Sequence, residues 1–177
     1  MPERFALLFR QQMDAIARAW VDAVYAERRT ELPSILSARE LVEYLPDVFD
    51  ELARILDDGV SHAEITESVL RLRAYAQMRF QQGVLIDEVA RELMLLRSVL
   101  NRFLWREALD AAEVDVRELR DALRRTNIFV DELIAQVLLI YASCMRPSIR
   151  TRSSLWPPTP QQRGRRREDD FPEKDEE

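Results

Sequence analysis

Apolar side chains recur at every third or fourth position through most of residues 4–144, and this spacing is typical of amphipathic α-helices. The first such row is formed by Phe5, Phe9, Ile16, Trp20 and Val24. No stretch alternates apolar and polar residues as a half-buried strand does. The chain also has only three glycines, too few for the many tight turns of an all-β fold. The sequence therefore predicts an all-α bundle.

Breaks in this spacing divide the chain into about five predicted helices, the last of them the longest. They are expected over residues 4–28, 38–57, 62–82, 85–108 and 114–144. Ser37 with Glu40, and Ser61 with Glu64, have the spacing of a capping box, in which each residue satisfies a backbone N–H of the first helical turn. Both pairs therefore predict a helix start.

Proline and glycine mark the other boundaries. Pro46 lies inside the second predicted helix, where it should kink the helix or split off its first turns. Gly59 and Gly83 suit the left-handed position just after a helix end. Gly83 is therefore expected to form the turn between the third and fourth helices.

The composition changes after residue 146. Residues 1–146 are expected to form one helical domain, and 147–177 a disordered tail, because the tail is polar, rich in proline and poor in branched aliphatic residues. A net charge of −6 gives no electrostatic footprint for nucleic acid. The N-terminus lacks the apolar core of a signal peptide, and Asp131 and Glu132 interrupt the most apolar stretch. We expect a cytoplasmic protein without membrane spans.

The residues needed for common active sites are missing. His62 is the only histidine, so a di-iron bundle with its paired Glu-x-x-His motifs is excluded. Cys144 is the only cysteine, so neither a Cys/His zinc site nor an intrachain disulfide is expected. No glycine-rich phosphate loop is present. The sequence predicts a protein with no metal, no cofactor and no enzyme activity.

Charged residues interrupt the apolar face of the fourth predicted helix. Glu92 falls within about 60° of the centre of that face when residues are placed at 100° intervals. A buried carboxylate needs a partner. Arg79 lies on the other side of the Gly83 turn, and Arg97 lies near the edge of the same face. These three residues are predicted to form a polar cluster, either a structural ion pair or a switch in a sensor pocket.

Further apolar residues indicate a contact surface. Met94 and Trp105 lie off the main row of the fourth helix, exposed to a partner or covered by other helices. One row on the last helix includes Asn127, Val130, Ile134, Val137 and Tyr141. The opposite side of that helix is apolar too, so the helix must be covered on all sides. It is either central in the bundle or part of a homodimer, and the sequence favours the homodimer.

Three segments together resemble a known family. They read "LPDVFDELARIL", "RFQQGVLIDEVARELMLLRSVLNRFLW" and "LRRTNIFVDELIAQVLLIYA". The chain resembles, over residues 3–145, the N-terminal domain of RsbR-type co-antagonists of RsbT, which also precedes the catalytic region of some bacterial histidine kinases. The residues that carry the family pattern are Arg79, Gly83, Glu92, Leu96, Arg97, Asn127, Asp131 and Tyr141.

The resemblance implies a bacterial stress-response regulator that senses a signal and acts by protein contact, with no activity of its own. The partner would be a protein such as a kinase or a sigma-factor regulator. Tyr75 stands near a place where the family often has histidine, and the tail after Pro147 is expected to hold no output module of the kind that usually accompanies this family. The alternative function is a helical bundle that binds a small anionic molecule near its arginines.

Overall fold

The computed structural model describes residues 3–57, 60–110 and 115–145, and these residues contain α-helices and no strand. The all-α fold predicted from the sequence is confirmed. The helices are α1 (Glu3–Ala26), α2 (Leu32–Ile35), α3 (Ala38–Val42), α4 (Leu45–Leu56), α5 (His62–Arg71), α6 (Arg73–Gln81), α7 (Ile86–Leu109) and α8 (Val116–Met145). The tail predicted for 147–177, and its boundary at 146, lie outside the described residues.

The five predicted helices become eight described helices because two of them are broken and one is additional. Pro46 lies in the first turn of α4 and separates it from α3, as its missing N–H predicts. The break between α5 and α6 has no proline or glycine. There the Leu72 N–H donates to the Val69 carbonyl, a tighter i→i−3 bond. The one-turn helix α2 was not predicted, since Pro33 in its first turn reads equally well as a break.

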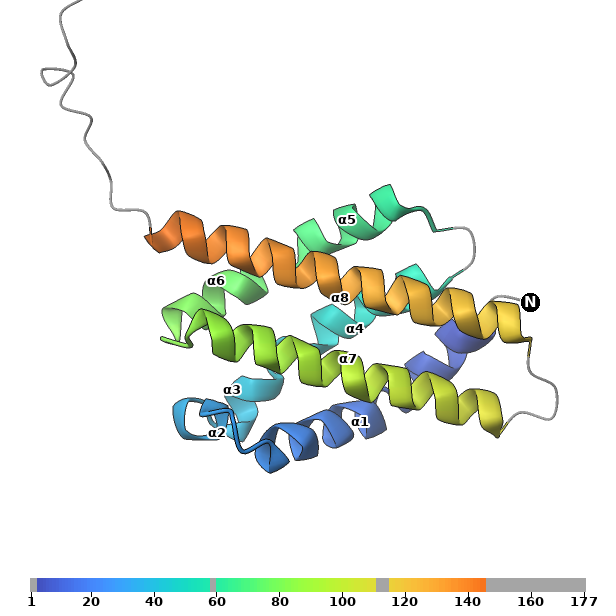
Figure 1. Ribbon diagram of the computed structural model, residues 1–177, viewed down its shortest axis with the longest axis horizontal. Helices are drawn as coiled ribbons and strands as arrows, with labels where there is room; N and C mark the ends of the chain where they lie inside the picture. Colours follow the sequence, from blue (N-terminus) through green and yellow to red (C-terminus); the bar gives the residue numbers. More distant parts are fainter. Residues whose placement is uncertain (1–2, 58–59, 111–114, 146–177) are drawn as a thin grey trace, which may run out of the picture. The chain divides into compact units, whose positions relative to one another are not determined.

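Helix α8 lies centrally and packs against α4, α5, α6 and α7 (Figure 1). Its Phe129, Val130 and Leu133 are fully buried in the one hydrophobic core of the bundle. By length and composition α8 also meets the requirements of a membrane span. Neighbouring helices bury one side of α8, while Leu138 and Leu139 on its other side are exposed.

Both predicted capping boxes are present. The Ser37 hydroxyl accepts from the Glu40 N–H while the Glu40 carboxylate accepts from the Ser37 N–H, and Ser61 and Glu64 repeat this arrangement. Gly83 ends α6 with φ of 76°, in the left-handed region. The Val84 N–H donates to the Arg79 carbonyl and the Gly83 N–H to the Phe80 carbonyl, which is the Schellman pattern. The Gly59 position lies outside the described residues.

Gly83→Ala is expected to lower the free energy of unfolding by about 1–2 kcal/mol. No atom lies within 4 Å of where the new methyl group would be, so the cost comes from the left-handed backbone alone. Urea denaturation followed by circular dichroism measures it. Gly83→Asn should cost less, because asparagine tolerates this conformation. Equal or greater stability of the alanine variant would contradict a left-handed Gly83.

Candidate functional site

The structure brings Arg79 of α6 and Glu92 of α7 together in the core. The guanidinium donates from Nε to Glu92 Oε2 at 3.1 Å and from Nη2 to Glu92 Oε1 at 2.7 Å. The two side chains are only 1% and 2% exposed. Such a fork-to-fork pair fixes both position and orientation, so it locks the α6–α7 hairpin around the Gly83 turn.

Arg79 also binds the end of α3. Its Nη1 donates to the Glu40 carbonyl at 3.1 Å and its Nη2 to the Leu41 carbonyl at 2.9 Å. The remaining Nη1 hydrogen goes to Gln82 Oε1 at 2.9 Å. Carbonyls in the last turn of a helix have no intrahelical donor, and α3 ends early because Pro46 follows. All five N–H groups of Arg79 are therefore used.

Two further hydrogen bonds attach α1 and α8 to the same region. The Trp20 indole of α1 donates to the Glu92 backbone carbonyl at 3.2 Å. The Tyr141 hydroxyl of α8 donates to the Val84 carbonyl, next to Gly83, at 2.8 Å. Together with the Arg79 contacts, these bonds join five helices, α1, α3, α6, α7 and α8, around one buried ion pair.

Burial and charge act against each other at this pair. Burial raises the pKa of Glu92, and the neighbouring Arg79 charge and hydrogen bonds oppose that rise. Burial alone would lower the pKa of Arg79, but the Glu92 carboxylate outweighs it and the net shift is upward. The Tyr75 ring lies under the guanidinium, with 5.4 Å from Arg79 Cζ to the ring centroid. The charged state of each member of the pair thus depends on the other, and the Tyr75 ring contacts the charged guanidinium.

Tyr75 contributes a buried hydroxyl to this region. Burial raises its pKa well above the ordinary value, and the Glu92 charge adds to that rise. No hydrogen bond of normal geometry reaches this hydroxyl from the described residues, although the carboxylate is near enough to affect it. Tyr75 is thus held in place by packing and by Arg79 rather than by its polar atom.

Stability is expected to fall between pH 10 and pH 12, and Tyr141 should contribute to that fall. Burial raises the pKa of Tyr141 from 10.0 to about 12. Above pH 10 the unfolded chain loses this proton while the folded chain keeps it, so stability decreases by about 1 kcal/mol per pH unit. Urea denaturation across this range measures the slope. Tyr141→Phe should have a shallower slope, and an unchanged slope would contradict the shift.

Arg97 does not join the buried pair, which corrects the three-residue cluster predicted from the sequence. Its Nη1 instead contacts Asp131 Oδ1 of α8 at 2.6 Å, with side chains 29% and 64% exposed. Arg97 lies five positions after Glu92, so the two side chains point about 140° apart around the helix axis. Arg97 therefore links α7 to α8 at the surface.

The predicted contact residues divide into exposed and buried groups. Met94 and Trp105 are each 52% exposed, and Ile134 is partly buried. Val130, Val137 and Tyr141 are buried within the chain, so an interface through those three is wrong for this structure. The physical reason is that α8 is central, and periodicity alone cannot distinguish burial within a chain from burial between chains.

Asn127 pairs helices within the chain. Its Oδ1 accepts from Asn101 Nδ2 of α7 at 3.1 Å, and its Nδ2 donates to the Leu123 carbonyl at 2.8 Å. With the Arg97–Asp131 pair, this contact sets the register of the antiparallel α7–α8 hairpin. The Oδ1 atom of Asn101 is buried without a hydrogen-bond partner among the described residues.

Other buried charges were not predicted from the sequence. Arg125 of α8 is 8% exposed and donates to the Ile55 and Asp57 carbonyls at the end of α4. Glu51 of α4 is buried and bound by Arg71 of α5. The available signal was the same in both cases, namely a charged residue at three- or four-residue spacing within an apolar row.

The remaining candidates for chemistry lie at the surface. His62 Nε2 is 3.4 Å from Glu132 Oε1, and Cys144, which the sequence places in an apolar run, is exposed. Among residues 3–57, 60–110 and 115–145, no group of three or more His, Cys, Asp or Glu side chains could hold a metal ion.

The family model for the RsbT co-antagonist protein rsbRD N-terminal domain matches residues 14–156. The chain belongs to this family. The resemblance noted in the sequence is thereby confirmed. RsbT co-antagonists are regulators of stress-response signalling, in a system whose proteins switch partners. Comparison with curated proteins and with solved structures finds no match.

Proposed function

We propose that this chain is a cytoplasmic, non-catalytic regulatory domain that acts by protein contact, as a homodimer that also binds a signalling protein. The partner would be a kinase or a sigma-factor regulator of the stress-response system. The observation that carries this proposal is the family match over most of the bundle. An exposed surface on α7 and α8 supports it.

That surface, the α7–α8 face, lies where the two helices run side by side in the foreground of Figure 1. It consists of Met94, Arg97, Asn101, Trp105, Asn127, Asp131, Ile134 and Leu138. Half-exposed Met94 and Trp105 lie eleven residues apart on one side of α7, about 20° apart around the axis. Large apolar and aromatic side chains of this kind are typical of interface cores.

The charges on this face suit a two-fold axis. Arg97 and Asp131 lie between Met94 and Trp105, so an antiparallel second copy would place each arginine near the partner copy's acid. The same arrangement brings Met94 against the second Trp105, a favourable sulfur–aromatic contact.

Sedimentation of the full chain tests the homodimer. The native protein should sediment as a dimer, and Met94→Glu and Trp105→Glu should each shift it to monomer without loss of helix content. Leu70→Glu is the matched control, because Leu70 on α5 is also 52% exposed and lies outside the face. A native monomer at high concentration, or a dimer unaffected by both substitutions, would overturn this part of the proposal.

Binding of a small anion near Arg79 is the less favoured function. Each of the five N–H groups of Arg79 already has an acceptor, four of them in Glu92 and the α3 carbonyls. An anion would have to displace these bonds inside a closed core. Protein contact therefore agrees better with the geometry.

A further inference from the structure

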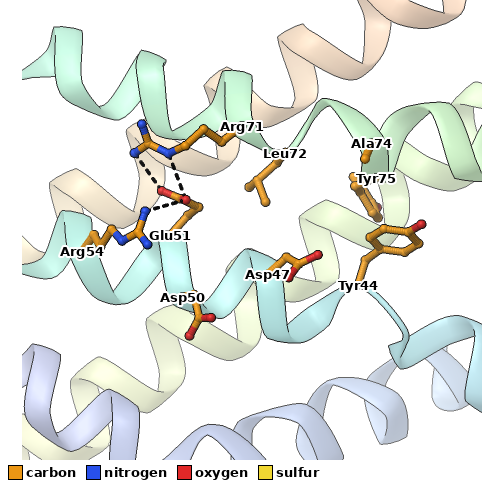
Figure 2. Close-up of a pocket in the computed structure, with 9 residues that line it drawn as sticks. All are labelled: Tyr44, Asp47, Asp50, Glu51, Arg54, Arg71, Leu72, Ala74 and Tyr75. Carbon is orange, nitrogen blue, oxygen red and sulfur yellow. Dashed lines mark hydrogen bonds and ion pairs between the residues drawn. The ribbon is translucent and has the colours of Figure 1, made fainter.

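A cavity of about 240 Å³ opens between α4 and the break that separates α5 from α6 (Figure 2). Glu51, Arg54 and Arg71 form one end of it, Tyr44 and Tyr75 the other, and Asp47 and Asp50 lie along the α4 side. This volume is well above the roughly 10–15 Å³ that a single water molecule needs.

The two arginines of the cavity are occupied by Glu51. Arg71 binds its carboxylate twice, from Nε at 3.0 Å and from Nη2 at 2.9 Å, and Arg54 Nη1 adds a third contact at 2.9 Å. Burial acts to raise the pKa of Glu51, but the Arg71 and Arg54 interactions lower it overall. Glu51 is thus ionised and compensated, and Arg71 also pairs with Glu67 at 3.3 Å, so two acids face the two arginines at that end.

Asp47 and Asp50 are left without compensation. They lie three residues apart on α4, therefore on one face of the helix, and both are exposed to the cavity side. Neither makes an ion pair or a side-chain hydrogen bond with the described part of the chain. The unbalanced charge of the cavity is therefore negative, which favours a cation.

The aromatic end of the cavity is also suited to a cation. The Tyr44 and Tyr75 rings lie edge to face, with centroids 6.4 Å apart and planes at 63°. Aromatic faces next to carboxylates are a recurring way to bind organic ammonium groups. Tyr75 is 4% exposed and its hydroxyl is buried on the inner side near Glu92, so Tyr75 offers this cavity its ring and not its hydroxyl.

We infer that this cavity is a binding site for a small organic ammonium ion. The ammonium contacts Asp47 and the Tyr44 face. The site uses α4, α5 and α6, so it goes beyond the proposed contact function and does not depend on dimerisation through α7 and α8.

Occupation of this site would reach the buried ion pair. Tyr44 and Tyr75 also line a second cavity of about 10 Å³, shared with Arg79 and Glu92. The two rings therefore stand between the surface cavity and the interior. Since Tyr75 also lies under the Arg79 guanidinium, a ligand that moves this ring changes the environment of the pair that joins five helices.

Calorimetric titration of the full chain with choline and with putrescine tests the site. At least one of the two cations should bind saturably at one site. For choline the neutral isostere 3,3-dimethyl-1-butanol should bind at least about tenfold more weakly, because a charge-assisted contact is lost. Asp47→Asn combined with Asp50→Asn should weaken cation binding about tenfold or more.

Asp121→Asn is the matched control, since Asp121 is an exposed acid on α8 outside the cavity, and it should leave binding unchanged. The inference is overturned if neither cation binds, if the isostere binds as well as choline, or if the double variant binds normally. Inorganic phosphate binding in place of the cations would assign the cavity to its arginines and also overturn it. Sedimentation tests dimerisation separately, so failure of one proposal leaves the other standing.

Discussion

Glu92→Ala is expected to lower the free energy of unfolding by about 3–5 kcal/mol. The substitution leaves the Arg79 guanidinium in the core with two of its five N–H groups unpaired and its charge uncompensated. It also removes the only side-chain bond that closes the α6–α7 hairpin at this depth in the described structure. Urea denaturation followed by circular dichroism at 222 nm gives the difference directly.

Two comparisons make this result specific. Glu92→Gln keeps an acceptor for Arg79 while removing the charge, so it should cost less than Glu92→Ala. Asp131→Ala breaks the exposed pair with Arg97 and should change stability by no more than about 1 kcal/mol. A loss of only about 0.5 kcal/mol or less for Glu92→Ala would mean that Glu92 is a surface residue, contrary to the structure.

Trp20→Ala is expected to lower the free energy of unfolding by about 3–5 kcal/mol as well. The indole is 1% exposed and joins α1 to α7 through its bond to the Glu92 carbonyl. Its removal leaves a large cavity beside the ion pair and breaks the hydrogen bond between α1 and α7. Circular dichroism is again the suitable measurement, since loss of a tryptophan changes the fluorescence signal itself.

Tyr25→Ala is the control for that substitution. Tyr25 is an aromatic residue on the same helix but 53% exposed, so its truncation should change stability by no more than about 0.5 kcal/mol. Trp20→Phe should lie between the two, because it keeps most of the apolar volume and loses only the hydrogen bond. Equal losses for Trp20→Ala and Tyr25→Ala would contradict the packing of α1.

Features decided by a few neighbouring residues could be predicted from the sequence. The capping boxes at Ser37 and Ser61, the break at Pro46 and the turn at Gly83 all follow from local backbone chemistry. The buried position of Glu92 also followed, because helical geometry fixes which side chains share a face. These features account for the fold class and for the buried carboxylate, for which the sequence offered Arg79 and Arg97 as partners.

Features decided by distant contacts could not be predicted. The sequence indicates that Arg97 lies near an apolar face, but not that Asp131, thirty-four residues away, is available to it. The central place of α8 is likewise set by four other helices. From the sequence alone, the row through Val130 and Val137 is equally consistent with burial inside one chain and with burial between two copies. The burial of Arg125 could not be predicted, because the α4 carbonyls that it binds are distant from it in the sequence.

The hydrogen bonds from Arg79 to the α3 carbonyls connect the role of Arg79 with that of Pro46, which lies thirty-three positions before it in the sequence. Pro46 interrupts the helix and leaves Glu40 and Leu41 with carbonyls to satisfy, and Arg79 supplies the donors. A relative with a helix-forming residue in place of Pro46 could run α3 directly into α4 and satisfy these carbonyls locally. Pro46 and Arg79 should therefore be conserved or replaced together across the family. Covariation between these two positions would be evidence for the contact between Arg79 and α3.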